Sequence, residues 1–182
     1  MINANGPSLP SKIIYYLPIN VTNTQASAFP VNGQLMLSIN SLSYAQYEAN
    51  DLQNVEFFYQ NGTIINSWLE GNLLNETQAS NLYSSSNTIY WLRMSGNFLP
   101  ASSSNMIFMG FASNTVNLLD GNVVGEAPQL SSQYAEYDNG ANVFAFYENF
   151  NGNSLDSSWL SPDKSRWKAR DRTCSPCKKN CK

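Results

Sequence analysis

Short runs of alternating apolar and polar residues cover much of the chain, and polar turns separate them. The best-defined pair of runs spans residues 54–70, with Asn61-Gly62 between two apolar-rich segments. Asn-Gly favours a two-residue type I′ hairpin turn, because both residues tolerate positive φ. This turn predicts a register in which Tyr59 faces Ile64. One face of the hairpin is then expected to enter a core: Val55, Phe57, Tyr59, Ile64 and Trp68.

Five more segments have the pattern of strands: residues 12–22, 34–42, 88–94, 106–112 and 142–150. Pro18 predicts that the first is an edge strand, because proline donates no ladder hydrogen bond. Residues 88–94 are apolar at nearly every position, which favours a central strand. Gly110 indicates a bulge or a close backbone approach. Seven strands with polar turns predict an all-β fold, an antiparallel β-sandwich or jelly-roll-like domain with long polar loops.

Charge divides the chain into two unlike parts. Residues 1–160 hold two basic and eleven acidic residues, a net charge of −9, whereas residues 161–182 carry +6. The acidic main body disfavours nucleic acid as its partner. We therefore expect a linker over residues 1–12, the sandwich over 13–150, and either the start of a second module or a disordered basic tail over 151–182.

Histidine is absent, and all three cysteines lie in the tail. The main body thus lacks the usual general base near neutral pH, Ser-His and Cys-His nucleophile pairs, and imidazole metal ligands. Cys174, Cys177 and Cys181 have a Cys-x-x-Cys spacing, but a closed zinc site needs a fourth ligand. No signal-peptide pattern and no apolar run of about 18 residues is present, so any export signal is expected outside this chain.

Five segments follow one another in a distinctive order: 54–57 (Asn-Val-Glu-Phe), 67–70 (Ser-Trp-Leu-Glu), 90–93 (Tyr-Trp-Leu-Arg), 107–111 (Ile-Phe-Met-Gly-Phe) and 143–150 (Val-Phe-Ala-Phe-Tyr-Glu-Asn-Phe). In this order they resemble the motifs of the DUF2341 domain family over residues 13–150. Two positions depart from the family pattern, Glu56 and the run Met109-Gly110-Phe111. The runs around residues 125–131 and 137–144 look like an archaeal branch of the family.

The resemblance implies a surface role and no reaction. In such proteins this domain commonly precedes a concanavalin-like lectin module, and residues 149–159 resemble the start of one, after which the likeness stops. The implied setting is a secreted or cell-surface protein, with glycans or other surface proteins as partners.

Tyrosines in polar surroundings are the candidate binding residues, because a flat ring can stack on a sugar while polar neighbours bind hydroxyl groups. They are Tyr44, Tyr47, Tyr83, Tyr134 and Tyr137, with Asp138 and Asn139 beside the last two. Trp68 and Trp91 are expected in the core. Asp138-Asn139-Gly140 with Asn142 offers oxygen ligands for Ca²⁺ but lacks the spacing of an EF-hand; a simple turn is the other interpretation, and no cofactor is predicted.

Paired carboxylates are the candidate catalytic groups, since glycoside hydrolysis needs two of them at one bond. Glu56 and Glu70 are predicted on opposite hairpin faces, which leaves Glu126, Glu136 and Asp138 in the long loop. Sequons at Asn20, Asn61 and Asn75 are no more frequent than the abundance of Asn, Ser and Thr makes expected. Three hypotheses follow: a non-catalytic adhesion or carbohydrate-contact module, a carboxylate-based glycosidase, and a structural spacer or assembly domain.

Overall fold

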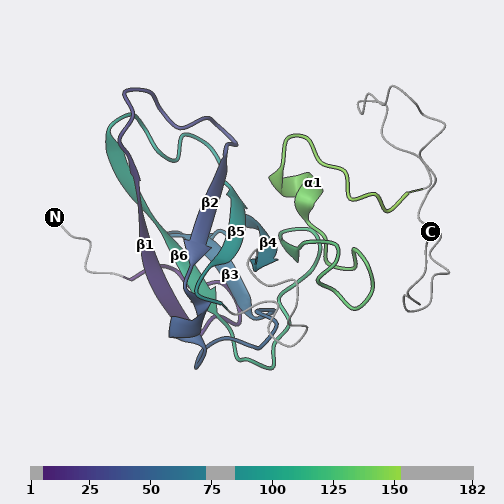
Figure 1. Cartoon of the computed structure of the whole chain (residues 1–182). Helices are drawn as coiled ribbons and strands as arrows, with labels where there is room; N and C mark the ends of the chain where they lie inside the picture. The colour runs from purple at the N-terminus through teal and green to yellow at the C-terminus, as the bar shows by residue number, and fades with distance from the viewer. Residues whose placement is uncertain (1–5, 73–84, 153–182) are drawn as a thin grey trace, which may run out of the picture.

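The structure, a computed structural model, describes residues 6–72 and 85–152, which form two sheets (Figure 1). The first sheet has the strand order β1-β6-β3. It contains β1 (Tyr15–Asn23), β6 (Ser103–Phe111) and β3 (Val55–Tyr59). The second sheet, with the order β2-β5-β4-β7, contains β2 (Gln34–Ile39), β5 (Thr88–Arg93), β4 (Asn66–Asn72) and β7 (Val124–Glu126). Two short helices are described, η1 (Ser41–Tyr44) and α1 (Gly140–Val143).

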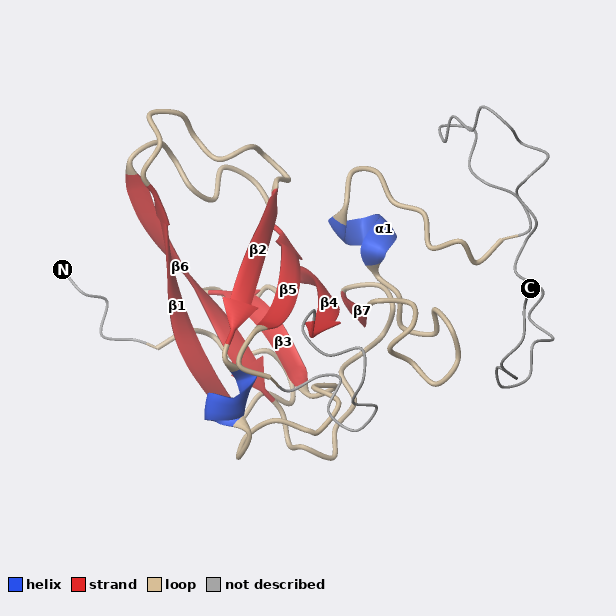
Figure 2. Ribbon diagram, viewed as in Figure 1, coloured by secondary structure: helices blue, strands red, loops and turns tan. Residues whose placement is uncertain are grey.

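The two sheets lie one against the other (Figure 2), and side chains of both form one main core. Fully buried side chains from both sheets meet there, including Phe57, Leu92, Ile107 and Met109 at 0% exposure. All strand pairs are antiparallel except β4 with β7, which is parallel. The prediction of an all-β sandwich is therefore confirmed.

Proline and glycine positions in the strands have clear structural reasons. Pro18 lies in β1, at the edge of the first sheet, and β5 lies centrally between β2 and β4, as predicted. Gly110 makes a close approach instead of a bulge: a Cβ there would lie 2.9 Å from the Phe58 ring and 3.1 Å from Ile13. The register through Gly110 is continuous, and the irregularity falls in β4, between Leu69 and Gly71.

The hairpin at Asn61-Gly62 is present, but its predicted register is wrong by one residue. Gly62 N donates to Tyr59 O at 2.8 Å and Tyr59 N donates to Thr63 O at 3.0 Å, so the loop has three residues. Only Gly62 has positive φ, +83°, as in a type I turn followed by a left-handed residue. Phe58 consequently pairs with Ile64.

This shift moves the side chains of β4 to the opposite face. Ile65 and Leu69 enter the core at 1% and 2% exposure, whereas Ile64 is 38% exposed. Trp68 lies on the outer face of the second sheet, paired with Trp91 in the register of β4 and β5. The expectation that both tryptophans belong to the core is therefore wrong for the main core.

A second, smaller apolar cluster covers the outer face of the first sheet. Ile13, Phe58, Phe108 and Ala112 are buried there, with Val116 and Leu118 packed against them. The N-terminal segment crosses this face, where Ser8 N donates to Gln60 O at 3.0 Å. Phe57 of β3 packs in the main core, and Phe58 packs in this second cluster. β3 is therefore buried on both faces although it is an edge strand.

The strand predicted over residues 142–150 is not formed, and β7 was not predicted. Residues 140–143 form α1, and the chain then turns back on itself. Phe144 and Tyr147 stack with ring centroids 5.7 Å apart, which an extended strand would prevent by placing them on opposite faces. A Cβ at Gly140 would strike the Tyr147 ring. Neither helix of the described residues is long and apolar enough to cross a membrane.

Candidate functional site

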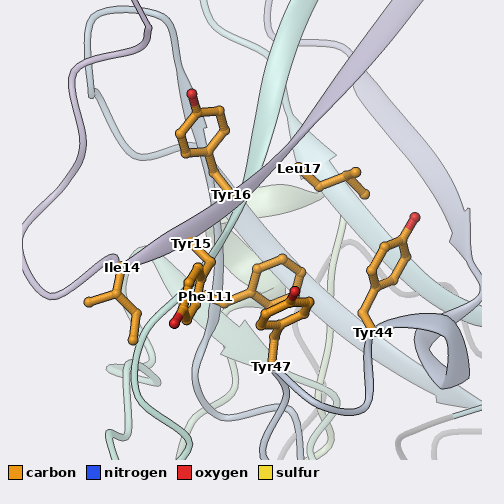
Figure 3. Close-up of a pocket in the computed structure, with 7 residues that line it drawn as sticks. All are labelled: Ile14, Tyr15, Tyr16, Leu17, Tyr44, Tyr47 and Phe111. Atoms are coloured by element: carbon orange, nitrogen blue, oxygen red, sulfur yellow. The ribbon is translucent and has the colours of Figure 1, made fainter.

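A shallow pocket lies where the start of β1 meets the segment after η1 and the end of β6 (Figure 3). Its volume is about 300 Å³. The residues that line it are predominantly aromatic: Ile14, Tyr15, Tyr16, Leu17, Tyr44, Tyr47 and Phe111. Two predicted binding residues, Tyr44 and Tyr47, are therefore brought together in one cavity.

Strand register explains how distant residues converge on this pocket. Tyr15 pairs with Phe111 across β1 and β6, and Ile14 N donates to Phe111 O at 3.0 Å. The Tyr15 and Tyr47 rings lie 5.0 Å apart with an angle of 52° between their planes. The centroid of the Phe111 ring lies 5.9 Å from that of Tyr47 and 6.2 Å from that of Tyr44. The buried Phe111 ring is thus the floor on which the tyrosines pack.

Sequence reasoning missed the contribution of β1. Tyr15 was not among the predicted binding residues, yet it lines the pocket and is 53% exposed. Tyr16 is 43% exposed and packs edge-on against Phe108 at 5.6 Å. Two adjacent tyrosines at the start of an edge strand were the available signal, because one of such a pair must face outward.

The segment that carries Tyr44 and Tyr47 is fixed by Asn54, which is fully buried. Asn54 Nδ2 donates to Tyr47 O and to Ala112 O, each at 2.8 Å, and its Oδ1 accepts from Ala49 N at 2.8 Å. One amide side chain therefore ties the segment to the end of β6. Tyr47 N also donates to Tyr44 O at 2.8 Å, which fixes the spacing of the two tyrosines.

The pocket offers aromatic faces and phenol groups, and none of its seven lining residues carries a formal charge. Flat rings can pack on the apolar face of a ligand, while tyrosine hydroxyls can donate and accept hydrogen bonds. No carboxylate lines the cavity. Its chemistry is that of binding a neutral, partly apolar ligand.

Four further predicted binding residues lie in the segment that covers the second sheet, and none of them lines the pocket: Tyr134, Tyr137, Asp138 and Asn139. Tyr134 is 47% exposed, and its hydroxyl donates to Asn149 O at 2.6 Å. A hydrogen bond to the Glu136 carboxylate raises the pKa of Tyr137. Asn139 is buried at 1% exposure and donates to Ser67 O at 3.1 Å and to Val123 O at 2.8 Å.

Asp138 is the centre of a hydrogen-bond network in this segment. Its Oδ1 accepts from Trp68 Nε1 at 3.1 Å, Gly140 N at 3.0 Å and Tyr147 Oη at 2.8 Å. Its Oδ2 accepts from Asn149 Nδ2 at 2.8 Å. Both carboxylate oxygens of Asp138 thus already have protein donors, and the described residues contain no group of three His, Cys, Asp or Glu side chains suited to a metal. A turn without a cofactor stays the prediction for this run, with Ca²⁺ binding as its alternative.

The candidate catalytic carboxylates do not converge at the pocket. Glu56 is 3% exposed in the first sheet, and burial raises its pKa to about 7. Glu70, in the second sheet, accepts from Trp91 Nε1 at 2.6 Å. Glu126 accepts from Ser131 Oγ, and burial, with smaller effects of Asp51 and Glu136, raises its pKa.

Comparison with known proteins gives one match, without a function. Over 161 residues, 84% of this chain, it is 35% identical to "Uncharacterized protein 562" of Sulfolobus islandicus rod-shaped virus 1. The chain spans 26% of the length of that relative. No family model matches, so the resemblance to DUF2341 stays a prediction. No solved structure matches either. Tyr83, Asn75, the lectin-like motif after Gly152 and the cysteine tail lie outside the described residues.

Proposed function

We propose that this chain is a non-catalytic β-sandwich module of a secreted or cell-surface protein, and that it contacts carbohydrate through the tyrosine pocket. The observation that carries the proposal is the convergence of Tyr15, Tyr44 and Tyr47 on Phe111 in an uncharged cavity. The half-exposed ring of Tyr15 suits stacking on a pyranose, and the tyrosine hydroxyls suit hydrogen bonds to its substituents.

The charge of the chain narrows the class of glycan. Residues 1–160 carry −9, and the pocket supplies no basic side chain to bind an acidic sugar. Anionic ligands would be repelled by this field at moderate salt. Neutral hexose-containing glycans are therefore the proposed ligands, and uronic acids and sulfated sugars are not.

A glycan array with the whole chain tests this proposal. Tyr15→Ala removes an exposed pocket ring, and Tyr134→Ala, at similar exposure, is the matched control because it lies outside the pocket. We expect binding to neutral glycans that Tyr15→Ala weakens about two- to tenfold, since aromatic contacts contribute about 0.5–1.5 kcal/mol. Equal losses in both variants, or binding confined to acidic glycans, would contradict the proposal.

A second candidate function is assembly through an exposed strand edge. β2 is one of the two edge strands of the second sheet in the described residues, and unlike β1 it contains no proline. Met36 on it is 53% exposed. An unprotected edge can pair with a strand of another molecule. Analytical ultracentrifugation over a range of protein concentrations tests this function. Oligomers that dissociate in the Ser38→Pro variant would support it, and a monomer at every concentration would contradict it.

A further inference from the structure

Glu48, the residue after Tyr47, is a buried carboxyl in the segment that carries the pocket tyrosines. It is 6% exposed. Within the described part of the chain, neither Oε1 nor Oε2 has a hydrogen-bond partner. An ionised carboxylate without donors in such a site is strongly disfavoured relative to the neutral acid.

Among the described residues, burial is the cause that shifts the pKa of Glu48, and no basic side chain offsets it. Glu48 interacts electrostatically with Tyr90 of β5. The Tyr90 hydroxyl is buried, and it too has no hydrogen-bond partner among the described residues. Burial, with a smaller effect of Glu48, raises the pKa of Tyr90 further above its ordinary value, so this phenol stays neutral.

The other charged groups of the main body interact with residues other than Glu48. The main body has two basic residues, Lys12 and Arg93. The charge of Lys12 lowers the pKa of Glu56, and the Arg93 guanidinium donates a hydrogen bond of 3.2 Å to Asn142 O. Asp51 lies in the same segment as Glu48, but its charge raises the pKa of Glu126. Burial without compensation raises the pKa of Glu48 to about 7.

The position of Glu48 in the chain links its charge to the pocket. It lies between Tyr47, whose carbonyl is held by Asn54, and Ala49, whose amide is held by the same side chain. Tyr44, Tyr47 and Tyr90 all pack against the main core. Glu48 cannot reach water unless this short segment moves, and the Asn54 hydrogen bonds resist that movement.

We propose that residues 44–54 form a pH-sensitive device, which holds the tyrosine pocket in place while Glu48 is protonated and opens when Glu48 ionises. Tyr47 leaves its place against Phe111 when the segment opens, because its backbone is no longer held by Asn54. The movement itself is independent of any ligand; its effect on glycan affinity rests on the proposed function.

Amide hydrogen exchange of the whole chain at pH 5 and pH 8 tests the device, after correction for intrinsic exchange rates. Protection at Tyr47, Ala49 and Leu52 is expected to fall by more than about tenfold at pH 8, since an opened carboxyl titrates near its ordinary value. Glu48→Gln, which cannot ionise, is expected to remove this fall. Glu136→Gln, an exposed carboxyl outside the segment, is the control and is expected to leave the fall unchanged.

Two results would overturn the inference. One is an equal change of protection in wild type and in Glu48→Gln. The other is an NMR titration in which the Glu48 carboxyl of the wild type ionises at its ordinary pKa, a result that stands even if the variant fails to fold. A pH-dependent segment in a protein that binds no glycan would refute the proposed function and leave the device intact.

Discussion

Trp68 and Asp138 lie 70 residues apart in the sequence, and Trp68 Nε1 donates a hydrogen bond of 3.1 Å to Asp138 Oδ1. This contact fixes the segment after β7 against the outer face of the second sheet. Phe144 and Tyr147 complete the attachment, with ring centroids 5.2 Å and 6.1 Å from Trp68. The residues that resembled a final strand thus serve as a cover for this sheet.

Asp138→Ala is expected to destabilise the domain by about 2–4 kcal/mol, because it leaves several half-buried donors without an acceptor. Urea unfolding followed by tryptophan fluorescence measures the loss, and the fluorescence of Trp68 should also change in the native state. Asp138→Asn is the matched variant. It keeps Oδ1 and loses only the acceptor for Asn149, so a smaller effect is expected. Equal stability of all three proteins would contradict the network.

Ile65 and Ile64 distinguish the observed hairpin register from the one that Asn61-Gly62 predicts. Ile65→Ala should cost about 2–5 kcal/mol, because it leaves a cavity in the main core. Ile64→Ala should cost less than about 1 kcal/mol, since Ile64 is 38% exposed. Chemical denaturation of both variants gives the comparison, and the reverse order would support the two-residue turn.

Gly62→Ala tests the conformation of the hairpin loop. Gly62 has φ of +83°, and a Cβ there would lie 2.9 Å from Ser8 O. Both strain and contact disfavour alanine, so a loss of about 1–2 kcal/mol is expected. Asn61→Ala, at a neighbour without positive φ, is the control and should lose clearly less; thermal unfolding of the pair decides.

Glu56 predicts how stability depends on pH. Burial raises its pKa from 4.5 to about 7 in the folded protein, an effect that Lys12 partly offsets and Asp120 increases. Because the folded state binds this proton more tightly than the unfolded state, stability is greatest below pH 4.5 for this group and is lost as pH rises to about 7. Burial also raises the pKa of Glu48 to about 7, so this group likewise lowers stability as the pH rises.

Urea midpoints at pH 5 and pH 8 measure this dependence. The wild type should be less stable at pH 8 through these two groups, and Glu56→Gln should reduce the difference. Glu136→Gln, an exposed carboxyl, should not. A difference between the two pH values that Glu56→Gln leaves unchanged would show that burial of this carboxyl is not its cause.

The sequence predicted those features that depend on local pattern. Alternation and turn residues indicated the sandwich, Pro18 the edge strand, and the apolar run at residues 88–94 the central strand. The predicted register of β4 was wrong because Asn-Gly fits hairpin loops of two different lengths. Only the packing of Ile65 in the core selects between these loops.

The candidate site was predicted in part for a similar reason. Tyr44 and Tyr47 stood out as tyrosines in polar surroundings, but their partners Tyr15 and Phe111 come from strands that looked wholly structural. The pairing of Tyr15 with Phe111 is a property of the sheet. Asp138 and Asn139 were chosen for their polarity, and their hydrogen bonds to Trp68 and Ser67 cross more than 60 residues of sequence.

The most direct test of the account is an NMR titration of the wild-type chain with the neutral glycans that an array selects. Binding at the tyrosine pocket predicts that perturbed amides concentrate at residues 14–17, 44–47 and 111, and that Tyr15→Ala reduces the perturbation at matched concentration. Perturbations centred on residues 134–139 instead, or none with any neutral glycan, would contradict the assignment of this pocket as a carbohydrate site.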